Sequence, residues 1–277
     1  GVQTFAPAIQ RAIGRVQPTA DIGCAVSMLR AAGAASINFD LMYGLPGQRL
    51  ADLDETLDTA VSLSPDRLAV FGYAHMPHLL PRQRLIDGND LPGAAMRFEQ
   101  ARLAHERLTR DGWETIGFDH FARPADTLAV AARNGALRRN FQGFTDDPAE
   151  ILIGLGASAI SAFGGALLQN EKNAGRYHLR IANGQFATAR GLRRSADDRK
   201  RGAAIEDLLC RGVADCAGLS DWASIRERSR PFVDLELASW SGSVLSLEPD
   251  ALPYARTIAA LFDRYRLSSA TRFSSAV

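Results

Sequence analysis

An alternation of apolar and polar residues at positions 36–41 is the clearest local signal in the chain. The apolar side chains recur at every second position, which is the period of a strand with one buried face: Ile37, Phe39 and Leu41. Residues 44–47 read Gly-Leu-Pro-Gly, which ends a strand because proline cannot donate to a ladder and glycine accepts a positive φ. Residues 52–62 then repeat apolar positions with the period of an amphipathic helix. This pattern predicts one strand–turn–helix unit of an α/β fold.

Helices and strands alternate through the next part of the chain. Helical patterns occupy residues 7–13, 21–32 and 94–110, and a second apolar strand is predicted at 67–73. Strands that alternate with helices in this way predict a parallel sheet with right-handed crossovers.

The pattern is less regular after residue 112. The elements expected next are a strand at 113–118, a helix at 126–134, an extended segment at 137–145 and an exposed helix at 173–184. The character of the sequence changes near 191–195, where a helix begins a smaller module. Periodicity is weak at 212–254, and a closing helix is predicted at 258–265.

The composition of the chain argues against several classes of protein. The chain has 277 residues, of which 46% are hydrophobic, enough for one large domain or two smaller ones. A net charge of +1 gives no electrostatic reason to expect nucleic acid or membrane as a partner. No apolar run approaches the ~18–20 residues that cross a bilayer, and no secretory signal is visible. The 3 cysteines are few and odd in number, which predicts a reducing, cytoplasmic location.

Asp40 is the first candidate for function. It lies inside an otherwise apolar strand, near the strand end where α/β folds place their chemistry. A carboxylate in that position costs several kcal/mol unless it is paired or bound to a ligand.

Other residues leave alternatives open. Asp119 and His120 follow a predicted strand and fit either an acid/base pair or a loop held by hydrogen bonds. Arg15 fits either a surface arginine or a planar clamp for a carboxylate. Residues 154–159 resemble half of a dinucleotide fingerprint, although close backbone packing explains their glycines better. Cys210 and Cys216 match no zinc or cluster spacing, which favours ordinary thiols.

Six segments together resemble the family of oxygen-independent coproporphyrinogen III oxidases, radical S-adenosylmethionine (AdoMet) enzymes of haem biosynthesis. The segments are residues 1–3 with 15–18, then 38–46, 73–77, 117–124, 139–144 and 156–161. The resemblance extends from residue 1 to about 207 and returns at 261–265. A sister branch of haem-chaperone-like proteins lacks Tyr-Ala-His-x-Pro and Phe-Asp-His-Phe-Ala, both of which this chain has, so the oxidase is favoured.

This resemblance implies an α/β fold: the second half of a partial (βα)6 radical-SAM barrel plus a mostly helical C-terminal domain. Residues 1–111 would form the C-terminal part of the barrel, 112–195 a segment that covers it, and 196–277 the C-terminal domain. The implied protein is an oxidoreductase, a coproporphyrinogen dehydrogenase, that acts as a monomer when full length.

The implied reaction is the oxidative decarboxylation of two propionates of coproporphyrinogen III, which gives protoporphyrinogen IX. The cofactors would be a [4Fe-4S] cluster and two AdoMet molecules per enzyme, and an electron donor would be a further partner. The cluster would cleave AdoMet reductively to supply the radical that removes a hydrogen from the propionate.

The resemblance also assigns site residues. Gln3, Arg15, Asp40 and Ala74 correspond to contacts to the second AdoMet, and Ile160 to a wall of the first AdoMet site. Phe141 and Gln142, the candidate catalytic residues, fall on an active-site loop of the family.

The family's cluster-binding cysteines have no counterpart in this sequence. The chain is therefore expected to be a C-terminal fragment, inactive alone, whose cluster ligands lie upstream. The alternative from another class is a non-catalytic tetrapyrrole-binding or haem-chaperone-like relative that has lost the cluster.

Overall fold

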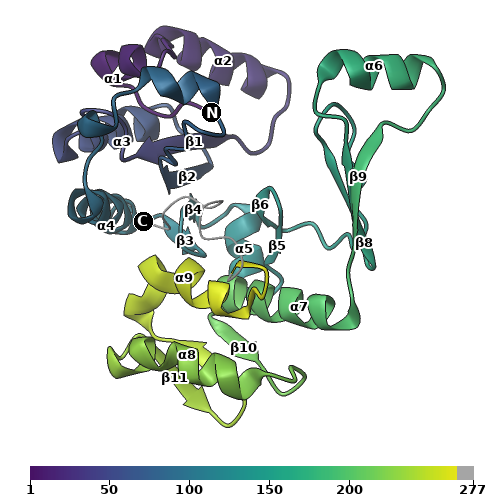
Figure 1. The fold of residues 1–277 in the computed structure, drawn as a ribbon. Coiled ribbons are helices and arrows are strands. Elements are labelled where there is room, and N and C mark those ends of the chain that lie inside the picture. Colours follow the sequence, from purple (N-terminus) through teal and green to yellow (C-terminus); the bar gives the residue numbers. More distant parts are fainter. Residues whose placement is uncertain (267–277) are drawn as a thin grey trace.

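A computed structural model describes residues 1–266. Its centre is a four-stranded sheet in the order β1-β2-β4-β3 (Figure 1). Strands β1 (Asn38–Tyr43) and β2 (Arg67–Gly72) run parallel, as predicted, and Asp40 lies opposite Ala69. Strand β1 begins two residues later than expected, and Asp66 accepts a hydrogen bond of 2.7 Å from the amide of Ile37 just before it.

The helices of this first part agree closely with the sequence pattern. They are α1 (Pro7–Ala12), α2 (Thr19–Ala31), α3 (Leu50–Ser62) and α4 (Ala94–Arg110). Short 3-10 helices η1 (Pro81–Leu85) and η2 (Gly88–Asp90) lie in the long connection after β2. Gly112 follows α4 with a φ of +81°, a conformation that ends helices and that glycine adopts without strain.

The predicted strand at 113–118 is instead a hairpin of two short strands. Strand β3 (Glu114–Ile116) turns at Gly117, whose φ is +60°, into β4 (His120–Ala122). Strand β4 then pairs with β2 in the antiparallel direction, which the sequence pattern did not predict.

One face of the sheet forms the main core. Phe39, Leu41, Leu68 and Val70 are buried there together with residues of the covering helices, among them Leu53, Leu57 and Leu108. Burial of this apolar surface is the main stabilising term of the unit, at roughly 25 cal/mol per Å² removed from water. The other face holds polar residues, described below, and at its β3–β4 end a second buried cluster that includes Ile116, Ala122 and Leu128.

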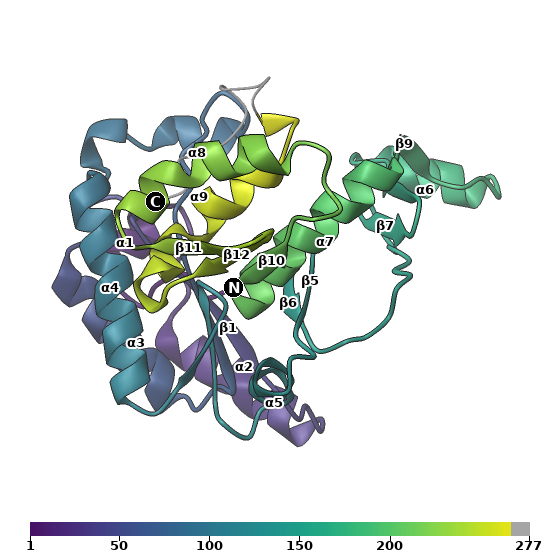
Figure 2. The ribbon, with the colours of Figure 1, turned by 90° about the horizontal axis from the view of Figure 1, so that it is seen from below.

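The middle of the chain forms a hairpin and a projecting arm. Helix α5 (Thr127–Arg133) leads to the hairpin of β5 (Arg138–Asn140) and β6 (Gly143–Thr145), where the sequence predicted an extended segment. The arm consists of β7 (Ile160–Phe163), β8 (Ala166–Asn170), α6 (Ala174–Ala182) and β9 (Thr188–Arg193). It extends away from the remainder of the molecule in two views (Figures 1 and 2). Its antiparallel sheet was not predicted, but its exposed helix was.

The C-terminal part has its own core around Leu208, Ile225 and Phe262. Its helical elements are α7 (Ala196–Arg211), α8 (Trp222–Asp234), η3 (Pro249–Tyr254), α9 (Ala255–Ala259) and η4 (Ala260–Phe262). Its sheet has the order β10 (Val213–Asp215), β12 (Val244–Leu247) and β11 (Ala238–Ser241). This small sheet was not expected. The predicted closing helix at 258–265 was wrong in its bounds, since α9 begins earlier and helical structure ends at Phe262.

Within residues 1–266, none of the helices combines the length and the apolar character needed to cross a bilayer.

Candidate functional site

Residues paired across the strands form rows of opposite character on the two faces of the sheet. Phe39, Leu68 and Phe121 pair in one row and are buried in the core. The next row lies on the other face, because successive side chains of a strand alternate. It consists of Asp40, Ala69 and His120. Strands about 4.8 Å apart place the Cα atoms of Asp40 and His120 about 10 Å apart, with the small Ala69 between them.

Asp40 is not the buried carboxylate that its strand suggested. Its side chain is 41% exposed, since it lies on the face away from the main core. Asn38 Nδ2 donates to Asp40 Oδ1 at 2.8 Å, and the Gly1 ammonium lies 3.9 Å from Oδ2. The expected desolvation cost is therefore absent, and Asp40 is open to a ligand.

Gln3 and Arg15 lie beside Asp40 through the first residues of the chain. The amides of Val2 and Gln3 donate to the Asp40 carbonyl at 2.9 and 2.7 Å. Arg15 Nη2 donates to the Gly1 carbonyl at 2.7 Å. Gln3 has a φ of +70° and is 9% exposed, and its Oε1 is buried without a hydrogen-bond partner. A carboxylate, a guanidinium and an unpaired amide oxygen are thus gathered in one place.

The β5–β6 hairpin separates two cavities. Gln142 lines a cavity of about 280 Å³ together with Asp40, Arg67 and His120. Phe141, its neighbour in the chain and 45% exposed, lines a different cavity of about 530 Å³ that reaches Ala162 of the arm. The two candidate catalytic residues therefore line different cavities, which Asn140 and Thr145 both border.

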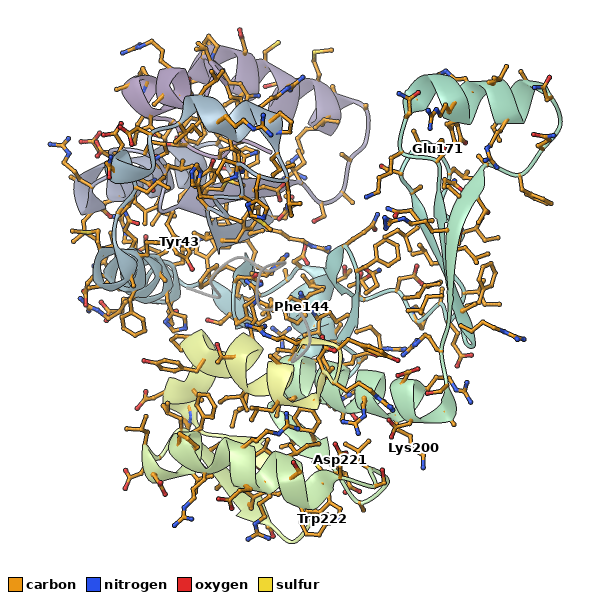
Figure 3. The ribbon with its side chains drawn as sticks, in the orientation of Figure 1. Tyr43, Phe144, Glu171, Lys200, Asp221 and Trp222 are labelled. Atoms are coloured by element: carbon orange, nitrogen blue, oxygen red, sulfur yellow. The ribbon has the colours of Figure 1, made fainter. Side chains whose placement is uncertain are left out.

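The hairpin is held against the sheet by Phe144, which is labelled in Figure 3. A Cβ added to Gly117 would lie 2.0 Å from the Phe144 ring, so only glycine fits there. The ring also meets His120 edge-on, with centroids 5.3 Å apart. The guanidinium of Arg139 lies 4.7 Å from the Phe144 ring centroid, and burial lowers the pKa of Arg139. These contacts hold the hairpin that carries Gln142 against the sheet.

Asp119 and His120 form a hydrogen-bonded pair. His120 Nδ1 lies 2.6 Å from Asp119 Oδ1, and because a carboxylate only accepts, the proton is on Nδ1. Both alternatives from the sequence are compatible with this bond, since it holds the turn and also orients the ring toward the cavity.

Ala74 and Ile160 lie apart from this group. Ala74 is five residues beyond Ala69 along the chain, about 16 Å at 3.3 Å per residue, and its carbonyl accepts from Gln83 Nε2 at 2.9 Å. Ile160 begins β7 of the arm. A Cβ added to Gly154 would lie 2.6 Å from the Ile160 carbonyl oxygen, which confirms that close packing explains this glycine.

The described residues contain no group of three or more His, Cys, Asp or Glu side chains that could hold a metal ion. Cys24 is exposed, Cys216 is buried, and Cys210 is intermediate. Burial raises the pKa of Cys210 and of Cys216 to about 11, which agrees with ordinary, unreactive thiols.

Comparison with known proteins identifies relatives with this architecture. No protein-family model matches the sequence. An oxygen-independent coproporphyrinogen III oxidase of Cereibacter sphaeroides is 42% identical over 285 residues, covering 100% of this chain and 63% of that protein. The corresponding protein of Thermostichus vulcanus is 35% identical over 292 residues and is covered to 89% of its length. The chain belongs to the oxygen-independent coproporphyrinogen III oxidase family.

The family's fold is also present. HemN, the coproporphyrinogen III oxidase of Escherichia coli and a radical SAM enzyme, matches with a TM-score of 0.88 and 34% sequence identity. That match covers 96% of this chain and 63% of HemN, so the chain spans about three fifths of that relative's length. The fold class predicted from the sequence is confirmed.

Sequence reasoning missed Arg67 and Asn140, which also line the Asp40 cavity. Arg67 lies outside the six family segments, and Asn140 lies within one of them, 139–144, but was not assigned a role. Their place in the site comes from strand register and from the hairpin turn, which linear spacing does not reveal.

Proposed function

We propose that this chain is part of an enzyme that converts two propionates of coproporphyrinogen III to vinyl groups, giving protoporphyrinogen IX. Each propionate loses one hydrogen atom, one electron and CO2. Membership of the oxidase family, at 35% identity over 89% of one relative, is the observation that carries this proposal. The haem-chaperone-like alternative has no specific observation in its favour.

The residues around Asp40 suit AdoMet. Asp40 can take charge-assisted bonds from an ammonium group or accept from ribose hydroxyls, and Arg15 can fork onto a carboxylate. The orphaned Oε1 of Gln3 is a buried acceptor that needs a donor, and AdoMet offers donors on its amine and ribose. We assign these residues to one of two AdoMet molecules.

Two further residues complete the assignment. Ala74 would contact the same AdoMet through its backbone, and since its carbonyl is engaged by Gln83, its amide is the group we expect to act. Ile160 would form an apolar wall of the other AdoMet site.

AdoMet, once reduced by an iron–sulfur cluster, supplies the radical chemistry. The described residues offer no ligand set for that cluster, so its ligands would come from outside them. Within this chain, Asp40, Gln3 and Arg15 would bind and orient AdoMet. Phe141 and Gln142 would shape the site and exclude water from it.

We further propose that the complete enzyme is a cytoplasmic monomer that takes electrons from a separate donor. Neither nucleic acid nor membrane has a role in the proposed reaction.

The direct test is to isolate the native protein that contains this chain from its own cells without oxygen. Its intact mass, iron and sulfide are measured, and coproporphyrinogen III, AdoMet and a reductant are then supplied. We expect four irons per protein, as in a [4Fe-4S] cluster, and formation of protoporphyrinogen IX with release of CO2. A folded protein that lacks iron or leaves the propionates intact would refute the enzyme proposal.

A further inference from the structure

His120 faces the same cavity as Asp40 from the opposite side. The two residues share one row of the sheet, and both line the cavity of about 280 Å³. Ala69, between them in the row, is buried with 2% of its surface exposed. A ligand that spans this row meets a carboxylate at one end and an imidazole at the other.

The imidazole is oriented and has one free nitrogen. Asp119 holds Nδ1 at 2.6 Å, while Nε2 makes no hydrogen bond with any described residue. Nε2 lies 3.5 Å from the point where a Cβ of Gly143 would be, so the absence of a side chain at this glycine leaves Nε2 accessible. The bond to Asp119 fixes the ring, so Nε2 keeps one position in the cavity.

The other cation of the cavity is already paired. Arg67 Nε donates to Asp126 Oδ1 at 2.8 Å, and Arg67 Nη2 lies 3.9 Å from Asp146 Oδ2. His120 is therefore one of the groups in this cavity that can offer a proton to an anion, along with the side-chain amides of Asn140 and Gln142.

We infer that His120 is a further catalytic residue that binds, as imidazolium through Nε2, the carboxylate of the reacting propionate. The inference rests on the proposed function and deepens it. Asp40 would hold the cationic cofactor on one side of the row, and His120 would hold the anionic substrate group on the other. The proton on Nε2 comes from solvent, is shared with the carboxylate as a hydrogen bond, and stays on the imidazole when CO2 leaves.

The test compares the native enzyme with His120→Asn, Asp119→Asn and His178→Asn variants, the last on the exposed helix α6. The KM for coproporphyrinogen III and kcat are measured from pH 6 to pH 9, and AdoMet affinity is measured in parallel. In the native enzyme we expect KM to rise with pH, because the proposed contact needs a proton on Nε2. The charged groups around His120 are Asp119, Asp40, Arg67 and Arg139, and they are the same in the His178 control.

His120→Asn should raise KM about 10- to 100-fold, as expected for loss of a charge-assisted hydrogen bond, and should remove the pH dependence. Asp119→Asn should raise KM by a smaller factor, because an amide holds the orientation of the ring less firmly than a carboxylate does. AdoMet affinity should not change in either variant. A purely structural role would lower the melting temperature and leave the pH profile in place.

Two outcomes overturn the inference. If His120→Asn leaves KM and its pH profile unchanged in an enzyme that still forms protoporphyrinogen IX, His120 does not bind the substrate. If AdoMet affinity falls while KM is unchanged, the carboxylate bound is that of AdoMet. Failure of the native enzyme to convert coproporphyrinogen III would instead refute the proposed function.

Discussion

Asp40 and His120 lie in one row across three strands of the sheet, with Ala69 between them. The neighbouring row, Phe39, Leu68 and Phe121, has the opposite character and belongs to the main core. The face that we assign to chemistry carries Asp40 and His120, although Ile116, paired with His120, belongs to a second buried cluster. This relationship gives the first prediction.

Ala69→Val should obstruct the row without touching either polar residue. Ala69 is 2% exposed, and two added methyl groups would stand between Asp40 and His120. We expect the KM for coproporphyrinogen III to rise about tenfold, equivalent to about 1.4 kcal/mol. Overpacking should lower the free energy of unfolding by about 1–3 kcal/mol. An unchanged KM would mean that no ligand crosses this row.

Asp126 joins three elements through one buried carboxylate. It is 3% exposed at its side chain and accepts hydrogen bonds from Arg67 Nε, Ser36 Oγ and the Leu128 amide, each at 2.8 Å. Asp126→Ala should lower the free energy of unfolding by about 3–5 kcal/mol, because it leaves Arg67 without its main partner and removes the cap of α5. Urea unfolding followed by circular dichroism measures this.

The matched control for Asp126 is Ser36→Ala, which removes one of these hydrogen bonds and should cost about 1 kcal/mol. Equal losses of unfolding free energy in the two variants would show that the Asp126–Arg67 ion pair adds little to stability.

Gly117 is required for two reasons: its backbone is in the left-handed region, and the ring of Phe144 packs against it. Alanine there would adopt a φ of +60° and collide with Phe144. Gly117→Ala should lower the free energy of unfolding by about 2–5 kcal/mol, the sum of the left-handed conformation and overpacking. In a Phe144→Ala background the collision is gone, so the same change should cost only about 1–2 kcal/mol. Identical costs in both backgrounds would contradict the packing of Phe144 on Gly117.

The thiols should differ in reactivity. Cys24 is exposed, whereas burial raises the pKa of Cys210 and of Cys216 to about 11. At pH 8, iodoacetamide should modify Cys24 first, because thiolate is the reactive form. Peptide mass spectrometry over time measures the three rates. Labelling of Cys216 as fast as Cys24 without denaturant would contradict the buried assignment.

The same thiols affect stability at high pH. A raised pKa in the folded state means that the folded chain keeps protons that the unfolded chain has lost. Between about pH 9 and pH 11, Cys210 and Cys216 should therefore lower the free energy of unfolding as pH rises. Cys216→Ser tests this, since it should weaken the pH dependence in that range.

The sequence predicted some elements residue by residue and others not at all. The helix expected at 94–110 is α4 (Ala94–Arg110), because a long amphipathic period and Gly112 both define it. Strands β10, β11 and β12 have only three or four residues each, too few for a period to appear. Their pairing is set by tertiary packing.

The candidate site, too, could be predicted only in part from the sequence. Asp40 was identified from its place in an apolar strand and Gln142 from the family resemblance, and both line one cavity. The place of Ala69 and Arg67 beside them depends on the register between β1 and β2, which no local pattern encodes. The exposure of Asp40 likewise depends on which face of the sheet the helices cover.

AdoMet binding to the native enzyme with Asp40→Asn tests the central claim most directly. Equilibrium dialysis under anaerobic conditions gives the number of sites and each Kd, with Glu55→Gln as control because Glu55 is exposed on α3 and makes no ion pair with the described residues. We predict two sites in the native enzyme and in the control. In Asp40→Asn we predict a Kd about 10- to 100-fold higher at one site, from the loss of charge-assisted bonds. Two unchanged sites in a folded Asp40→Asn enzyme would contradict the assignment of this face of the sheet to AdoMet.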